Sequence, residues 1–126
     1  MRRALATALA LGALLPGGAS ATVSGAVFEL EELRHRLAGT EGPWLEFFAN
    51  ANLRTGLYRL PAGSEDLQNP HAEDEIYFVL RGKAVISIAG EDRPVGSGAV
   101  IFVAAEVEHR FHSITEDLDV LVFFAR

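Results

Sequence analysis

A series of short apolar runs extends from Trp44 to Phe124. Each run has the length of a β-strand, and the residues between runs are rich in glycine, proline and asparagine, which favour tight turns. The runs occupy residues 44–48, 53–60, 76–81, 84–89, 99–103, 109–114 and 118–124. Turns are predicted at residues 61–63, 82, 90–92 and 96–98. The pattern predicts an antiparallel β-sandwich or barrel rather than β-α-β units.

One short helix is predicted before the first strand. Leu30, Leu33 and Leu37 recur at intervals of three and four residues, which is the spacing of one face of an α-helix. Glutamates in the first turn and basic residues in the last turn both stabilise the helix macrodipole, and Gly39 is a suitable stop. The helix is therefore expected over residues 29–38, and the predicted fold class is all-β with a single N-terminal helix.

The first 21 residues have the organisation of a secretory signal peptide. Arg2 and Arg3 precede an apolar run at residues 4–15, which is too short to cross a bilayer of about 30 Å as a helix. Small residues at positions 19–21 then form a typical cleavage pattern. The expected organisation is a signal peptide at 1–21, a segment with the short helix at 22–43 and a barrel at 44–126. Cleavage would leave a periplasmic or secreted protein without membrane attachment, whereas a misassigned N-terminus would leave a cytoplasmic one.

Composition restricts the chemistry that this chain can perform. Its 126 residues suit one domain with one modest core. Its net charge is -6 and its 11 lysines and arginines are scattered, so nucleic acid is not an expected partner. The absence of cysteine excludes disulfides, thiolate-bound zinc and thiol catalysis. Any site must therefore use the four histidines, the carboxylates and the hydroxyls.

The first candidate site lies in residues 69–82. On a strand that begins near residue 69, His71, Glu75 and Tyr77 point to the same side, because side chains alternate along a strand. The opposite side carries isoleucine, phenylalanine and leucine at positions 76, 78 and 80, so both sides are expected to be largely buried. A buried ionised carboxylate is stable only when it is paired or bound to metal. Glu75 is therefore expected either to bind a metal or to pair with an arginine such as Arg54 or Arg59.

The second candidate site lies in residues 98–113. His109 and His112 differ by three positions, so on a strand only one of them can face a shared interior. His109 would share its side with Phe111 and Ser113, while His112 would lie on the other side. His71 is expected to be either a metal ligand or a histidine at the edge of a loop. His109 is expected to be either a metal ligand or a histidine of the core. Tyr77 is expected either to contact a bound molecule or simply to fill the barrel.

These two segments resemble the paired motifs of the cupin superfamily. In the first motif, Gly63 precedes His71, three residues separate His71 from Glu75, and six residues separate Glu75 from Gly82. In the second motif, Gly98 and His109 have the family spacing. The resemblance covers residues 45–124 and implies a single small antiparallel barrel of the jelly-roll type.

The chain also departs from the family pattern. Asn69 occupies the position of the first histidine, so the His-x-His element is incomplete. In the second motif, alanine, glutamate and serine replace the proline, glycine and asparagine at positions 104, 106 and 113.

The resemblance implies that His71, Glu75 and His109 bind one divalent metal ion, with Asn69 or Gln68 as an optional weak fourth ligand. Two imidazoles and one carboxylate with open positions suit iron(II), while manganese, nickel and zinc are alternatives. The expected function is a metal-binding cupin that acts on a small organic molecule by dioxygenase, isomerase or lyase chemistry. The alternatives are a non-catalytic cupin that binds a sugar or small metabolite, and a structural barrel without metal.

A homodimer is also expected. The runs at residues 44–48 and 120–124 supply more large apolar side chains than one small core obviously needs. The resemblance implies pairing through such strands.

Overall fold

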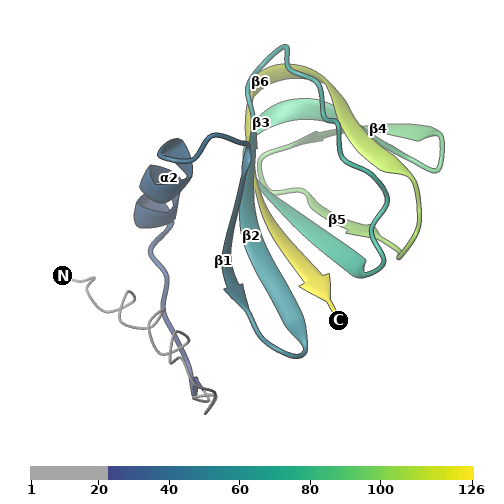
Figure 1. Cartoon of the computed structure of the whole chain (residues 1–126). Helices are drawn as coiled ribbons and strands as arrows, with labels where there is room; N and C mark the ends of the chain where they lie inside the picture. Colours follow the sequence, from purple (N-terminus) through teal and green to yellow (C-terminus); the bar gives the residue numbers. More distant parts are fainter. Residues whose placement is uncertain (1–22) are drawn as a thin grey trace. The chain divides into compact units, whose positions relative to one another are not determined.

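The computed structural model describes residues 23–126, so the predicted signal peptide lies outside the described residues. One helix, α2 (Leu30–Ala38), precedes six strands (Figure 1). The strands are β1 (Trp44–Ala49), β2 (Leu53–Leu60), β3 (Asp74–Ile88), β4 (Glu91–Gly96), β5 (Val100–Val103) and β6 (His109–Ala125). The helix predicted over residues 29–38 is confirmed. Within the described range, no helix is long and apolar enough to cross a membrane.

All strand pairs are antiparallel, and this confirms the predicted fold class of an all-β jelly roll. The strand order is β1-β2-β6-β3-β4, and β5 also pairs with β3. The two longest strands, β3 and β6, pair along most of their length and bend together (Figure 1). They position the candidate site, because Glu75 lies near one end of β3 and His109 begins β6.

Two strands are longer than the sequence predicted. The predicted turn at Gly82 is wrong, because this residue lies inside β3 and joins the runs at 76–81 and 84–89. Gly82 has φ 105°, and a Cβ there would lie 2.3 Å from the carbonyl oxygen of Asp117. The glycine therefore permits a close approach of β3 to β6 where their register shifts.

The pattern also missed β4. The predicted turn at 90–92 is displaced, because Ala89 and Gly90 form the turn with φ 51° and 85°, and β4 begins at Glu91. Both values suit a two-residue hairpin. The strand escaped prediction because it is largely exposed and contains Pro94, so it has no apolar run.

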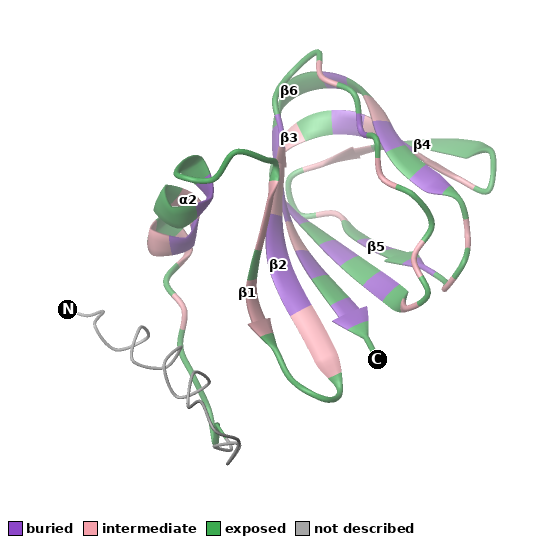
Figure 2. Ribbon diagram, in the orientation of Figure 1, coloured by how far each residue is buried: buried purple, intermediate pink, exposed green. Residues whose placement is uncertain are grey.

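The core lies on the inner side of the sheet, and burial alternates along β3 (Figure 2). The expectation that both sides of this strand are largely buried is wrong, because Ile76 is 40% exposed and Phe78 is 37% exposed. Most of the terminal apolar run faces inward, since Val120, Val122 and Phe124 belong to the core and Phe123 is exposed. The exposed apolar residues on this outer side are Ile76, Phe78, Val100, Phe102 and Phe123.

Candidate metal and ligand site

The site begins in the loop before β3. The predicted strand start near residue 69 is wrong, because β3 begins at Asp74 and His71 lies in the preceding loop. Pro70 lacks a backbone donor, which disfavours continuation of the sheet ladder. The backbone of His71 is nevertheless held, because its carbonyl accepts a hydrogen bond from the Glu106 amide at 2.6 Å. Glu75 and Tyr77 point inward from β3 as predicted.

His109 enters the site from the first position of β6. It is buried, and its Nδ1 donates to the carbonyl oxygen of Val107 at 2.8 Å, which leaves Nε2 directed at Glu75. This contact selects one tautomer in the neutral ring. Burial tends to lower the pKa of His109, but the nearby Glu75 carboxylate and the Val107 carbonyl outweigh burial and raise the pKa above its usual value.

His112 faces away from this site, as the sequence predicted. Its Nε2 lies 3.1 Å from Oδ1 of Asp92. The predicted grouping of Ser113 with His109 is wrong, because Ser113 has φ 50° and Ile114 is buried instead. The change follows from the shifted register between β3 and β6, since an irregular residue reverses the sides on which the following residues lie.

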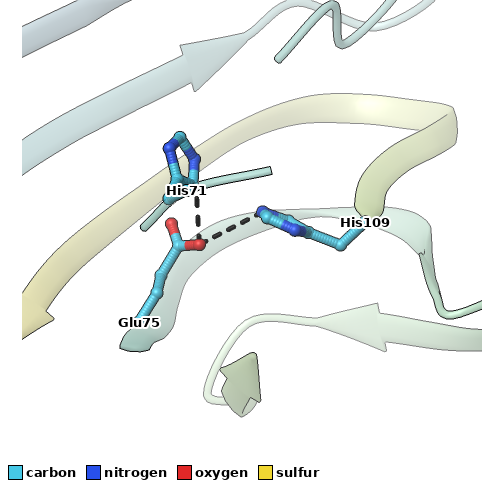
Figure 3. A group of neighbouring side chains, drawn as sticks. All are labelled: His71, Glu75 and His109. Atoms are coloured by element: carbon cyan, nitrogen blue, oxygen red, sulfur yellow. Dashed lines mark ion pairs between the residues drawn. The ribbon is translucent and has the colours of Figure 1, made fainter. Parts of the chain in front are cut away.

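The structure brings His71, Glu75 and His109 together (Figure 3). One potential ligand atom from each residue lies within 4.8 Å of the others. Oε1 of Glu75 is 3.1 Å from Nε2 of His109 and 3.9 Å from Nε2 of His71. The three side chains come from a loop, from β3 and from β6, and their potential ligand atoms converge on one point.

The Glu75 carboxylate is 2% exposed. Among the described residues, its Oε1 is the buried side-chain oxygen that has no well-directed hydrogen bond. Neither arginine alternative is its partner. Arg54 forms its hydrogen bonds to Glu73 and Glu46, and Arg59 pairs with the fully buried Asp119. An under-satisfied buried oxygen between two imidazole nitrogens fits a divalent cation, because two neutral imidazoles and one carboxylate are suitable ligands for such ions.

Two further side chains, Gln68 and Tyr77, approach the same point. Oε1 of Gln68 accepts a hydrogen bond from the Tyr77 hydroxyl at 3.1 Å and lies 3.0 Å from Nε2 of His71. The Tyr77 hydroxyl is also 3.1 Å from Nε2 of His109. Burial, followed by the charge of Glu75, raises the pKa of Tyr77, so this phenol stays protonated at neutral pH. Asn69, the other expected weak ligand, is exposed.

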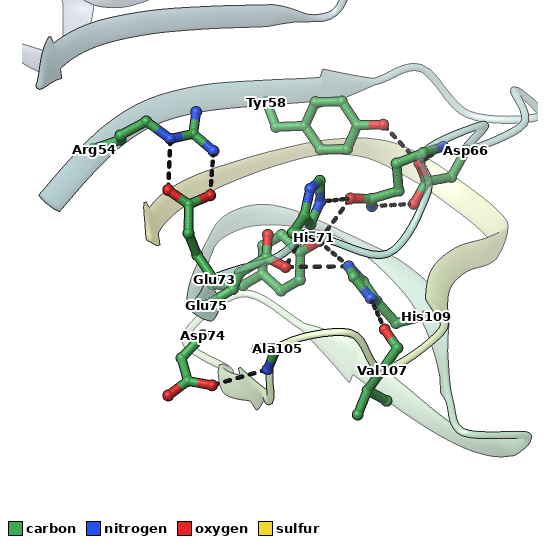
Figure 4. A network of polar contacts seen from close by, with 12 residues as sticks. Arg54, Tyr58, Asp66, His71, Glu73, Asp74, Glu75, Ala105, Val107 and His109 are labelled. Carbon is green, nitrogen blue, oxygen red and sulfur yellow. Dashed lines mark hydrogen bonds and ion pairs between the residues drawn. The ribbon is translucent and has the colours of Figure 1, made fainter. Parts of the chain in front are cut away.

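Sequence reasoning missed Asp66, which is 4% exposed and contacts the Gln68 side chain beside the candidate ligands. Its carboxylate accepts hydrogen bonds from the Tyr58 hydroxyl and from the Gln68 side-chain amide (Figure 4). No apolar pattern surrounds Asp66 in the sequence, because it lies in the loop between β2 and β3. Its burial results from tertiary contacts that local periodicity does not encode.

A cavity of about 230 Å³ opens beside two of the three candidate ligands, His71 and Glu75. The rest of its wall is mostly aromatic and aliphatic, with Trp44, Tyr58, Tyr77, Val122 and Phe124, and it also includes Gln68 and Arg54. Trp44 packs edge to face against the rings of Tyr58 and Phe124. A small apolar pocket with a few convergent polar groups is typical of a site for a small organic molecule.

Comparisons with known proteins agree with this geometry. A family model described as the cupin domain matches residues 56–125. An uncharacterized protein from Streptomyces coelicolor is 47% identical over 98 residues, which cover 78% of this chain and 93% of that protein.

Two solved structures are also similar. A DMSP lyase from Ruegeria pomeroyi is 28% identical with a TM-score of 0.58, over 63% of this chain and 41% of the lyase. This chain therefore spans less than half the length of that lyase. A predicted oxalate decarboxylase from Thermotoga maritima is 26% identical with a TM-score of 0.57, over 65% of this chain and 77% of the other.

Proposed function

Because the chain belongs to the cupin family, we propose that it binds one divalent metal ion through His71, Glu75 and His109 and receives a small organic molecule in the adjacent cavity. The observation that carries this proposal is Oε1 of Glu75, which is buried between two imidazoles without a well-directed hydrogen bond. A divalent ion at this position satisfies that oxygen. Iron suits the set of ligands, and manganese, nickel and zinc are the alternatives.

The protein's own groups would orient both the ion and the molecule beside it. Val107 holds the His109 ring so that Nε2 faces the site. The protonated Tyr77 hydroxyl lies beside the candidate ligands, where it can form a hydrogen bond to a polar group of the bound molecule. Trp44 and Phe124 would contact its apolar part. A metal ion in such a site polarises a substrate oxygen or activates water or O2.

The substrate class is therefore a small organic molecule with one oxygen-bearing end and one apolar end. Dioxygenase, isomerase and lyase chemistry are all compatible with this set of ligands. The similarity to a DMSP lyase and to a predicted oxalate decarboxylase supports a bond-cleaving reaction, but fold similarity does not select one reaction.

The second candidate function is non-catalytic binding of a sugar or small metabolite in the same cavity. The observation that favours it is the exposed Asn69 at the position of the family's first histidine, because one expected imidazole is then missing. A structural barrel without metal is less consistent with the buried and under-satisfied Glu75.

Metal analysis of the purified protein tests the proposal. A chelator first removes any bound metal, and the protein is then reloaded with metal and passed through gel filtration. We expect elemental mass spectrometry to find about one metal ion per chain. The His109→Ala variant should retain much less. Absence of bound metal from reloaded, folded wild-type protein would contradict the metal-binding function. Turnover of a panel of small carboxylates and hydroxy acids would then separate an enzyme from a binding protein.

Export to the periplasm or medium stays a prediction, because residues 1–21 lie outside the described part of the chain. Intact-mass measurement of protein from these compartments would test cleavage after residue 21.

A further inference from the structure

We infer that Oε1 of Gln68 is a fourth protein ligand of the metal, and that Asp66 is the positioning residue that directs this oxygen into the site. The inference rests on the proposed metal-binding function. It distinguishes Gln68 from Asn69, which the sequence left as equal alternatives. It also assigns a role to a buried carboxylate in the loop between β2 and β3.

The first support is the spacing of five polar atoms around one point. Successive distances are 3.0 Å from His71 Nε2 to Gln68 Oε1, then 3.1 Å to the Tyr77 hydroxyl and 3.1 Å to His109 Nε2. Glu75 Oε1 completes the ring of atoms, because it lies 3.1 Å from His109 Nε2 and 3.9 Å from His71 Nε2. Neighbouring ligands of an octahedral ion with bonds of about 2.1 Å lie about 3 Å apart. Gln68 Oε1 therefore already has the spacing of a ligand that adjoins His71.

The second support is the orientation of the Gln68 amide. A carboxylate can only accept hydrogen bonds when ionised, so the side-chain nitrogen of Gln68 must be the atom that lies 2.7 Å from Oδ2 of Asp66. The carbonyl oxygen of the same amide consequently faces His71 and Tyr77. An amide turned the other way would place two oxygens against each other at Asp66.

The third support is that Asp66 is itself held rigidly. Its carboxylate accepts hydrogen bonds from the Tyr58 hydroxyl at 2.6 Å, from the Phe111 amide at 2.9 Å and from the Gln68 backbone at 3.3 Å. Phe111 is fully buried in β6, two residues after His109. Asp66 therefore ties the loop that carries Gln68 to the strand that carries a candidate ligand. Groups behind a metal ligand fix its orientation in this way.

The lone pairs of Gln68 Oε1 permit this role. In the structure it accepts from Tyr77, and its other lone pair faces Nε2 of His71. A histidine that binds metal through Nε2 carries no proton on that nitrogen. The lone pair that faces His71 is then free for the ion, while the hydrogen bond from Tyr77 remains.

Titration of chelator-stripped protein with Co²⁺ tests the inference, with calorimetry for affinity and visible absorption for coordination. We expect Gln68→Ala to weaken Co²⁺ binding about 10- to 100-fold and to change the visible spectrum. The matched control is Asn69→Ala, which removes the neighbouring exposed amide and should leave both affinity and spectrum unchanged. Asp66→Ala should resemble Gln68→Ala, because alanine removes the carboxylate oxygen that accepts the hydrogen bond from the Gln68 side-chain amide.

The double variant Asp66→Ala/Gln68→Ala separates positioning from general support. If Asp66 acts through Gln68, the double variant should bind Co²⁺ as weakly as Gln68→Ala alone, whereas independent effects would multiply. Multiplied effects would overturn the assignment of Asp66. Wild-type affinity and spectrum in Gln68→Ala would overturn the assignment of Gln68 and leave the three-residue site intact. Failure of folded wild-type protein to bind Co²⁺ would instead overturn the inference together with the proposed function.

Discussion

Oε1 of Glu75 lies 3.1 Å from Nε2 of His109, although the two residues belong to different motifs and different strands. A metal ion that binds there only in the native state should raise the melting temperature of the protein. We expect this increase to disappear in His109→Ala and to persist in His112→Ala, because His112 faces Asp92 outside the site. Thermal unfolding with and without a chelator measures the effect. Equal behaviour of the two variants would contradict the assigned site.

Gly82→Ala should destabilise the protein by about 3 kcal/mol, because it combines an unfavourable backbone conformation with a steric clash. The added Cβ would lie 2.3 Å from the carbonyl oxygen of Asp117. Gly63→Ala is the matched control, since Gly63 also has positive φ but an added Cβ there would meet no atom within 4 Å. Its cost should be about 1 kcal/mol. Urea unfolding measures both values, and similar losses would show that the close approach of β3 and β6 is unimportant.

Asp119→Ala should destabilise the protein by about 3–5 kcal/mol, because the variant leaves two arginines without their buried partner. The Asp119 carboxylate is fully buried and pairs with Arg59 at 2.8 Å and with Arg81 at 2.9 Å. Glu116→Gln is the control, because Glu116 forms an exposed pair with Lys83 and should change stability by less than about 0.5 kcal/mol. A small effect at Asp119 in urea unfolding would contradict the assigned importance of this buried pair.

His112 should control the titration of Asp92. The hydrogen bond from His112 lowers the pKa of Asp92 below its usual value. This interaction therefore stabilises the folded state above the usual carboxyl pKa and is lost as the pH falls through the lowered value. Titration followed by carboxyl NMR shifts should show the Asp92 pKa rising towards its usual value in His112→Ala. An unchanged Asp92 pKa in that variant would exclude His112 as the cause.

The homodimer stays a prediction, but the run at 120–124 faces largely inward, so we now expect a second copy of the chain to cover the exposed apolar residues on the outer side of β3, β5 and β6. Ile76 is paired in register with both Phe102 and Phe123, so these side chains lie on one continuous surface. Light scattering at micromolar concentration should give twice the mass of one chain. Phe102→Lys should reduce this mass without changing the circular dichroism spectrum, because a charge at the interface opposes association. A wild-type mass equal to one chain would refute the homodimer.

The amino-acid sequence was enough to predict the fold class and the candidate site residues. Short apolar runs separated by turn residues predicted an antiparallel barrel, because local periodicity reports which side of a strand is buried. The resemblance to the paired cupin motifs implied that His71, Glu75 and His109 converge, and the structure brings them together. The same pattern placed His112 outside the site.

How the strands bend and which groups support the candidate site depends on contacts between distant parts of the chain. Gly82 and Ser113 continue their strands with positive φ, and local patterns cannot distinguish such residues from turns. Asp66 is buried where its carboxylate accepts a hydrogen bond from the amide of Phe111, which lies 45 residues further along the chain. Gln68 rather than Asn69 reaches the site because Asp66 orients its amide. These choices depend on contacts between distant residues, and such contacts leave no periodic signal in the sequence.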